Sequence, residues 1–190
     1  MKHLLLIAFL TACGHQPQAV EPHPELATRR AQMLGYLAEY TERGVFPTDE
    51  RGLPLSVFED ARGVRCPMAE LIYRSGHPEL VAAIVAEDNH ARLGDIHDGP
   101  VHDWMVGSGL THDEIVMIQG IADINYGPLF KIEQPANVIT AQRERVRGRL
   151  ETAQAALRKD QRDSLTAATL VLPQHRVPVV KVTRPAIAKH

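Results

Sequence analysis

The sequence is short of cysteine, of aromatic residues and of net charge. Only two of its 190 residues are cysteine, which excludes a disulfide framework. Aromatic residues make up 5%, so the hydrophobic core must be mainly aliphatic. The net charge of -2 excludes the strongly basic balance of a dedicated nucleic-acid-binding protein. With 44% hydrophobic and 23% charged residues, the chain has the composition of one ordinary globular domain with tails, or of two very small domains.

One strongly apolar run stands at the N-terminus. Lys2 precedes an apolar stretch from Leu4 to Leu10, and small residues follow it. This is the layout of a secretory signal peptide, and the stretch is too short to span a bilayer. We therefore expect residues 1–12 to be a signal peptide.

The residues at the end of this stretch predict a membrane anchor in addition to export. Leu10-Thr11-Ala12-Cys13 resembles the lipobox of bacterial lipoproteins. The resemblance implies cleavage before Cys13 and acylation of Cys13 by palmitate-type chains, several of which together hold a protein stably in a membrane. Gly14 replaces the Asp that favours inner-membrane retention in enterobacterial lipoproteins, which favours the outer membrane. An ordinary signal peptide with a coincidental cysteine, or a short N-terminal core helix, is the alternative.

Composition divides the remaining chain into four parts. Residues 13–24 contain three prolines and no periodicity, which predicts an extended tether behind the lipidated cysteine. Residues 25–130 carry the pattern of an acidic helical domain. Residues 131–172 are expected to form a linker and a basic helix, and residues 173–190 a flexible basic tail.

The expected fold is mainly α, with one short β-hairpin. Apolar residues at helical spacing predict a helix over residues 25–43 that ends at Gly44. Two short segments, Leu53 to Glu59 and Val64 to Cys66, flank the turn signal Asp60-Ala61-Arg62-Gly63, which predicts the hairpin.

Prolines, glycines and a capping pattern delimit further helices. Pro67 is expected to open a helix that stops at Gly76, and Pro78 to open the next. A short helix around Trp104 is expected to stop at Gly109, before the capping-box pattern Thr111-His112-Asp113-Glu114. Because the helix after this joint offers acidic residues rather than basic ones, we expect an αα-hairpin in a helical core, not a DNA-binding motif.

Acidic and basic residues are unevenly distributed along the chain. Residues 14–135 hold 19 acidic and nine basic residues, whereas residues 136–190 hold 11 basic and four acidic ones. Good helix formers predict a helix over about residues 137–165. Its apolar residues form a narrow stripe, namely Val146, Leu150, Ala153 and Leu157. The basic arm is expected either to be solvated, to fold back on the acidic domain, or to bind an anionic lipid, an anionic polymer or an acidic partner.

Cys66 is the candidate for covalent chemistry. Once Cys13 is lipidated, Cys66 is the only thiol of the chain. It precedes Pro67 at an expected helix start, where backbone amides would stabilise a thiolate, and His77 is the nearest histidine that follows it. The favoured interpretation is a small buried side chain at the hairpin–helix junction. A catalytic or redox role, intermolecular pairing and metal binding are the alternatives.

A histidine-rich stretch is the candidate for metal binding. It contains His90, His97, His102 and His112 together with Asp95, Asp98 and Asp103. Imidazole with carboxylate suits zinc or a similar metal. The spacing matches no known site, so exposed, pH-responsive histidines and helix-capping aspartates are the favoured interpretation. No cofactor is predicted beyond the lipid on Cys13.

Three segments in the middle of the chain carry a wider resemblance: Arg43-Gly44-Val45-Phe46-Pro47, Gly63 to Leu71, and Ser108 to Thr111 with Glu114 and Ile118-Gln119. With them, about residues 36–128 resemble domains of secreted and lipid-anchored bacterial proteins that have no assigned activity. The resemblance implies a shared architecture and export, and it favours a functional role for Cys66.

These patterns favour a lipid-anchored envelope protein that acts as a binding, interaction or structural module. Its expected partners are the bilayer, through Cys13, and an envelope protein or anionic polymer, through residues 136–190, with no role in nucleic-acid binding. The alternative is an envelope thiol enzyme, or a redox or metal protein, that uses Cys66 with a nearby histidine. An enzyme is the less favoured of the two.

The lipobox gives the first testable prediction. A Cys13→Ala variant of the full chain should leave the membrane fraction, because the residue that carries the acyl chains is lost. Fractionation of cells followed by immunoblotting checks this. A variant that is still processed normally and held in the membrane contradicts the anchor.

Overall fold

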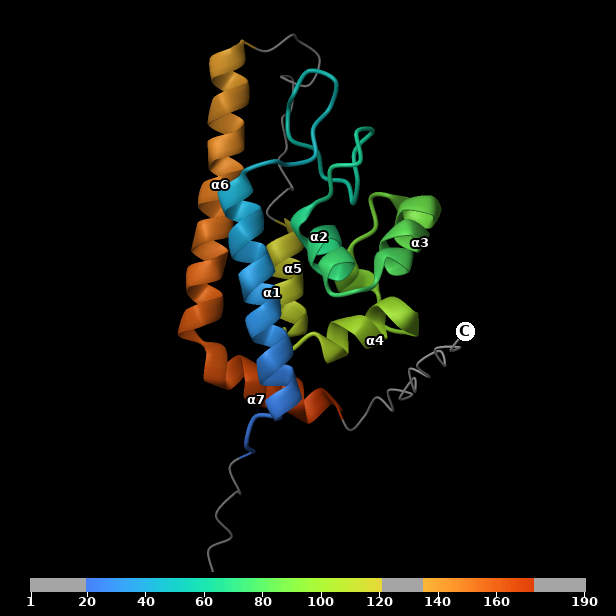
Figure 1. Cartoon of the computed structure of the whole chain (residues 1–190), viewed down its shortest axis with the longest axis vertical. Coiled ribbons are helices and arrows are strands. Elements are labelled where there is room, and N and C mark those ends of the chain that lie inside the picture. The colour runs from blue at the N-terminus through green and yellow to red at the C-terminus, as the bar shows by residue number, and fades with distance from the viewer. Residues whose placement is uncertain (1–19, 121–134, 173–190) are drawn as a thin grey trace, which may run out of the picture.

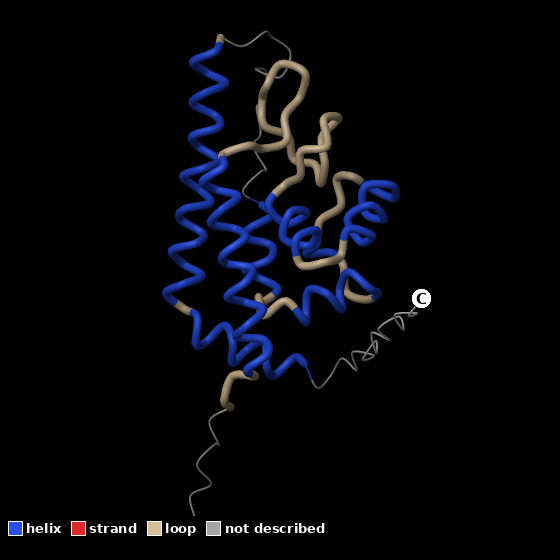
Figure 2. Tube along the Cα trace, viewed as in Figure 1, coloured by secondary structure: helices blue, strands red, loops and turns tan. Residues whose placement is uncertain are grey.

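The computed structural model describes residues 20–120 and 135–172, which form a mainly α-helical domain (Figure 1). The helices are α1 (Pro24–Arg43), α2 (Pro67–Arg74), α3 (Pro78–Asp88), α4 (Gly99–Gly107), α5 (His112–Gly120), α6 (Ala136–Lys159) and α7 (Gln161–Val171), with a 3-10 turn, η1 (Leu93–Asp95). No β-strand occurs in this described part, as the colouring of Figure 2 makes plain. Cys13, most of the expected tether and the expected tail lie outside the described residues.

Helix α1 stands at the centre of the arrangement. It packs against α2, α6 and α7, while α5 packs against α2, α4, α6 and η1. Figure 1 shows α1 and α6 side by side along the long axis, α7 crossing near their lower end, and α2, α3 and α4 on the opposite side from α6. No helix within the described ranges has both the length and the apolar character needed to cross a membrane.

The helix boundaries confirm the start and stop signals that the sequence predicts. Helix α1 ends at Gly44, whose φ of 62° lies in the left-handed region that favours glycine. Helix α5 carries the expected capping box: Thr111 N donates to Glu114 Oε2 at 2.8 Å, and Glu114 N donates to Thr111 Oγ1 at 3.3 Å. Proline occupies the first turn of α1, α2, α3 and α4. The predicted helices around these signals are therefore present.

The expected β-hairpin is wrong, although its turn is correct. Residues 60–63 do form a turn, closed by Gly63 N donating to Asp60 O at 2.9 Å. The two flanking segments meet at one isolated antiparallel bridge, Glu59 with Arg65, and a second isolated bridge joins Pro54 to Thr48, which lies outside both segments. No ladder extends from either bridge, so the segment between α1 and α2 is a folded loop.

The side-chain carboxylate of Asp60 holds this loop together. The side chain of Asp60 accepts hydrogen bonds from the backbone N–H groups of Thr48 at 2.9 Å, Arg62 at 2.9 Å and Val64 at 3.0 Å. Of these donors, Val64 N belongs to a predicted strand, and it is then not available to the backbone carbonyl of the opposing strand. Burial by itself raises the pKa of Asp60, but the hydrogen bonds outweigh burial and lower this pKa to about 2. The loop is thus organised by a buried charge.

Helix α6 belongs to the hydrophobic core. The four apolar residues of its predicted stripe, Val146, Leu150, Ala153 and Leu157, are all buried in the same cluster as residues of α1, α2 and α5. Gln154 Nε2 donates to Thr41 Oγ1 of α1 at 2.7 Å in the same interface. The predicted single helix over residues 137–165 is two helices, because Asp160 (φ -100°, ψ 21°) interrupts it between α6 and α7.

A buried ion pair joins five parts of the fold. Arg30 of α1 is fully buried, and its Nη1 and Nη2 atoms donate to the two carboxylate oxygens of Glu114 at 2.7 and 2.6 Å. Arg30 also donates to Gly109 O between α4 and α5 at 3.1 Å and to Leu157 O of α6 at 2.7 Å. Ser164 of α7 donates to Glu114 Oε1 at 2.8 Å. Burial raises the pKa of Glu114, but its bonds to Arg30, Thr111 and Ser164 produce a net lowering.

This ion pair gives a prediction about stability. Glu114→Gln should destabilise the fold by about 3–5 kcal/mol, because it leaves a buried, uncompensated guanidinium. Since the folded state lowers the pKa of Glu114, the stabilisation is present above the pKa of the unfolded carboxyl and is lost as the pH falls through the lower folded value. Urea unfolding at several pH values measures both effects.

The matched control is Glu39→Gln. Glu39 pairs with Arg74 at 2.7 Å but is 62% exposed, so its loss should cost about 0–1 kcal/mol. Equal losses in the two variants would show that the buried pair has no special role.

Candidate functional site

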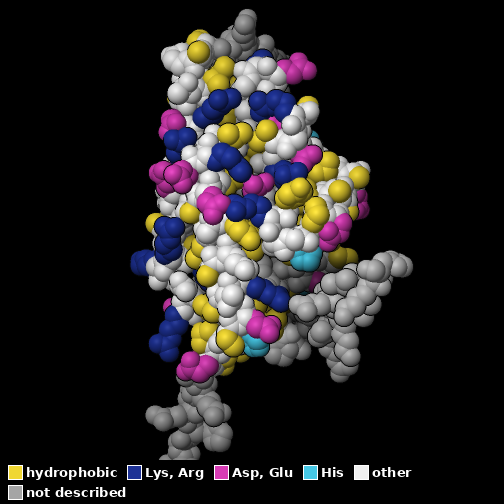
Figure 3. All heavy atoms as spheres, in the orientation of Figure 1, with side chains coloured by type: hydrophobic (Ala, Val, Ile, Leu, Met, Phe, Trp, Pro, Cys, Tyr) yellow, Lys and Arg dark blue, Asp and Glu magenta, His cyan; other side chains and the backbone are white. Residues whose placement is uncertain are grey.

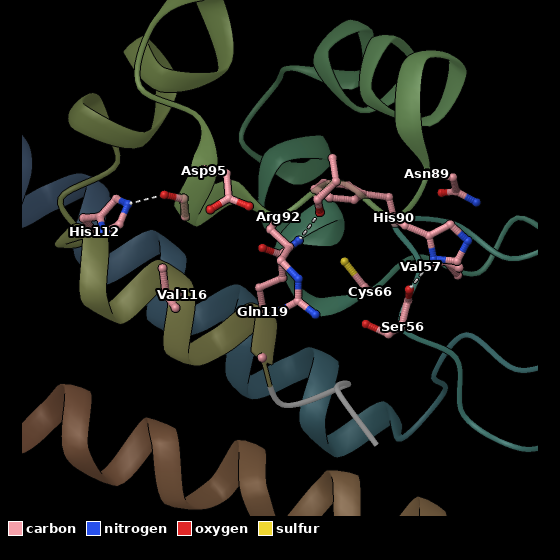
Figure 4. A pocket seen from close by; sticks show the side chains of 14 residues that line it. Ser56, Val57, Cys66, Asn89, His90, Arg92, Asp95, His112, Val116 and Gln119 are labelled. Atoms are coloured by element: carbon pink, nitrogen blue, oxygen red, sulfur yellow. Dashed lines mark hydrogen bonds between the residues drawn. The ribbon is translucent and has the colours of Figure 1, made fainter. Parts of the chain in front are cut away.

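A pocket of about 390 Å³ opens between the loop before α2, the loop after α3 and helix α5. Its lining comprises Ser56, Val57, Phe58, Cys66, Asn89, His90, Ala91, Arg92, Gly94, Asp95, His112, Val116, Gln119 and Gly120. Figure 4 shows the sulfur of Cys66 between His90 and Ser56 on one side and Arg92 and Gln119 on the other. This hollow, the Cys66 pocket, is the candidate site.

The structure brings together only some of the residues predicted from the sequence. Cys66, His90 and His112 line the same pocket. His77 does not; it is exposed at the start of α3, where its Nδ1 lies 3.2 Å from Glu79 Oε1. His97 stacks on His112 with ring centroids 6.4 Å apart, and His102 lines a second, smaller pocket together with His112.

The Cys66 thiol is held in its protonated form. Cys66 is the N-cap of α2, and its Sγ accepts a hydrogen bond from Ala69 N at 3.4 Å. The side chain is 3% exposed, and this burial raises the pKa of the Cys66 thiol to about 11. Although the helix amides favour the thiolate, as the sequence suggests, desolvation outweighs them. The thiol is therefore weakly nucleophilic near neutral pH.

The amide of Asn89 fixes one wall of the pocket. Asn89 Oδ1 accepts from Glu59 N at 3.0 Å, and Asn89 Nδ2 donates to Glu59 O at 2.8 Å. The backbone continues this pairing, because Phe58 N donates to Asn89 O at 2.8 Å. A side-chain amide presents one donor side and one acceptor side, so it pairs with a backbone unit as a strand would. The loop before α2 is thereby tied to the end of α3.

The amide of Gln119 fixes the opposite wall in the same way. Gln119 Oε1 accepts from Leu93 N at 2.7 Å, and Gln119 Nε2 donates to Ala91 O at 2.8 Å. Leu93 is fully buried in the core below this contact. The loop between α3 and η1 is thus held against α5.

Two histidines complete the attachments of the walls. Nδ1 of His90 lies 3.1 Å from Ser56 O, and Nε2 of His112 lies 3.1 Å from Gly94 O. Because a carbonyl oxygen only accepts, each of these ring nitrogens carries the proton and donates it. In a neutral ring the other nitrogen is then an acceptor. These attachments give the pocket a preformed shape.

The residues of this pocket are partly recognisable from the sequence. Cys66, His90 and His112 are marked by residue type, whereas Asn89 and Gln119 act through backbone groups that only the folded chain brings within reach. The residues within the described ranges contain no group of three or more His, Cys, Asp or Glu side chains arranged to hold a metal ion. Comparisons of the chain with protein-family models, with curated proteins and with solved structures found no match.

The environment of Cys66 predicts slow alkylation. At pH 8, iodoacetamide should modify Cys66 at least about 100-fold more slowly in the native protein than in urea, because raising a pKa by about two units lowers the thiolate population about 100-fold. Mass spectrometry of quenched samples measures the two rates. A native rate within tenfold of the unfolded rate would instead favour the thiol-enzyme interpretation.

Proposed function

We propose that the protein is a lipid-anchored binding module of the bacterial envelope, whose helical domain takes a small ligand in the Cys66 pocket. The observation that supports this most is the set of walls held in place by Asn89, His90, His112 and Gln119. Ligand pockets are commonly preformed and about 300–1,000 Å³ in volume, and this pocket falls in that range. The anchor at Cys13 comes from the lipobox-like sequence.

The state of Cys66 favours binding over thiol catalysis. A nucleophilic cysteine needs a lowered pKa or an adjacent base. Here the pKa of the thiol is raised to about 11, and the hydrogen bond of Sγ is made with Ala69 N. His90 and His112 each use one ring nitrogen to hold a wall. Cys66 then serves as a small, weakly polar part of the pocket lining.

The lining indicates the chemistry of the ligand. Val57 and Val116 offer apolar surface, while Arg92 and Asp95 bring one positive and one negative side chain to the same pocket (Figure 4). Opposite charges complement the carboxylate and the ammonium group of an amino acid or short peptide. We therefore assign a zwitterionic ligand of this class, with an apolar side chain.

Two substitutions on α5 test this proposal. Val116 is 42% exposed and lines the pocket, so Val116→Trp should fill it. Met117 is 44% exposed and is not among the lining residues, so Met117→Trp is a matched control on the same helix. The wild-type chain and both variants are screened by saturation-transfer NMR against apolar amino acids and dipeptides.

The proposal expects at least one saturable ligand in this panel. Its affinity should fall at least tenfold in Val116→Trp and stay within twofold in Met117→Trp. N-acetylated and amidated forms of the ligand, which lack its charges, should bind at least tenfold more weakly. The proposal fails if no panel member binds, or if both tryptophan variants bind equally.

A further inference from the structure

A second hollow lies beside the C-terminal end of α7. It is formed by α4, α5 and α7, has a volume of about 130 Å³ and is lined mainly by apolar side chains, among them Met105, Leu110, Ile115, Ala168 and Val171. We call it the α7 groove. An apolar cavity of about 150 Å³ accommodates a benzene ring, so the α7 groove has room for one aliphatic side chain.

The chain itself points to an occupant of this groove. Val171 is both the last residue of α7 and part of the groove lining, and residues 173–190 follow directly. A chain spans at most about 3.3–3.6 Å per residue, so a few residues suffice to return to a groove at this helix end. Residues 177–182 read Val-Pro-Val-Val-Lys-Val, which supplies several aliphatic side chains of suitable size.

Charge favours the same occupant. Besides Glu114, whose charge is paired with Arg30, residues 93–120 include four acidic residues and no Lys or Arg. Asp103 and Asp113 directly follow His102 and His112, both of which line the groove. Residues 173–190 contain four Lys or Arg residues and no acidic ones. An apolar segment with basic neighbours thus complements an apolar groove with acidic neighbours.

Apolar side chains next to the groove are exposed, which favours a segment that covers them. Leu170 is 54% exposed and Val171 is 40% exposed, on the last turn of α7. By contrast, Figure 3 shows basic and acidic side chains interspersed over the face that carries α6, so α6 presents no uniformly charged surface there. The observations favour the α7 groove over α6 as the surface for the basic segment.

We propose that residues 177–182 dock in the α7 groove of their own chain. His112 lines both this groove and the Cys66 pocket, so the docked segment would lie against one wall of the candidate ligand site. The docking itself does not depend on the ligand proposed for that pocket.

Disulfide formation between introduced cysteines tests this docking in the full mature chain. Ala167 is exposed and lines the groove, and it is combined with a position in the segment as Ala167→Cys/Val180→Cys. The control pair is Ala61→Cys/Val180→Cys. Ala61 is exposed and belongs to the segment between α1 and α2, whose loops Figure 1 shows at the opposite end of the molecule from α7. Peptide mass spectrometry identifies the linked residues, and circular dichroism confirms that each variant is folded.

The docking predicts that the 167–180 disulfide forms within single chains, at least tenfold faster than the 61–180 disulfide. High salt should slow the 167–180 disulfide, because charge contributes to docking. Equal rates for the two pairs overturn the proposal. Linkage only between two chains also overturns it and assigns the groove to a second copy.

Removal of the segment provides an independent measurement. A chain that ends at Leu172 should show at least tenfold faster amide exchange around Met105, Ile115 and Ala168, with unchanged exchange in α2. Unchanged exchange in all of these helices overturns the docking, whereas the amino-acid binding of the Cys66 pocket is scored separately by NMR.

Discussion

The buried pairing of Arg30 with Glu114 is the interaction on which the rest of the fold depends. A buried ion pair is costly unless its charged groups have hydrogen-bond partners. Here Arg30 of α1 donates to Glu114 of α5, to the joint before α5 and to α6, and Glu114 also accepts from Ser164 of α7. Gly109 permits this arrangement, because a Cβ there would collide with Leu26 O of α1. The pair therefore fixes α5, and α5 supplies His112, Val116 and Gln119 to the candidate site.

Local signals in the sequence predicted the helices well. The signals at the helix ends act within a few residues, so they can be interpreted without knowledge of the tertiary structure. They are Gly44, the prolines at the helix starts and the Thr111–Glu114 capping box. The β-hairpin was wrong, because the side chain of Asp60 takes the N–H of Val64 and ties the turn to Thr48, which lies outside the predicted strands. The capping box gave no sign that Glu114 also binds Arg30, 84 residues away in sequence.

The candidate site was predictable in part, for a similar reason. Residue type marked Cys66 and the histidines, but type alone could not show that His77 lies apart or that His90 and His112 attach loops. The protonation of Cys66 follows from its burial, which outweighs the helix-start effect visible in the sequence. Asn89 and Gln119 are ordinary amides until folding brings backbone groups to them. The apolar stripe of residues 137–165 did not by itself show what covers it, and in the folded chain it is buried in the core, where α6 packs against α1 and α5.

Arg30 and Glu114 stabilise the fold as one unit rather than as two independent side chains. A double-mutant cycle of Arg30→Met, Glu114→Gln and the double variant measures this most directly, with unfolding free energies from urea titration. We expect a coupling energy of about 2–3 kcal/mol, because each single variant leaves a buried polar group without its partner. A coupling below about 0.5 kcal/mol, with additive losses, would contradict it.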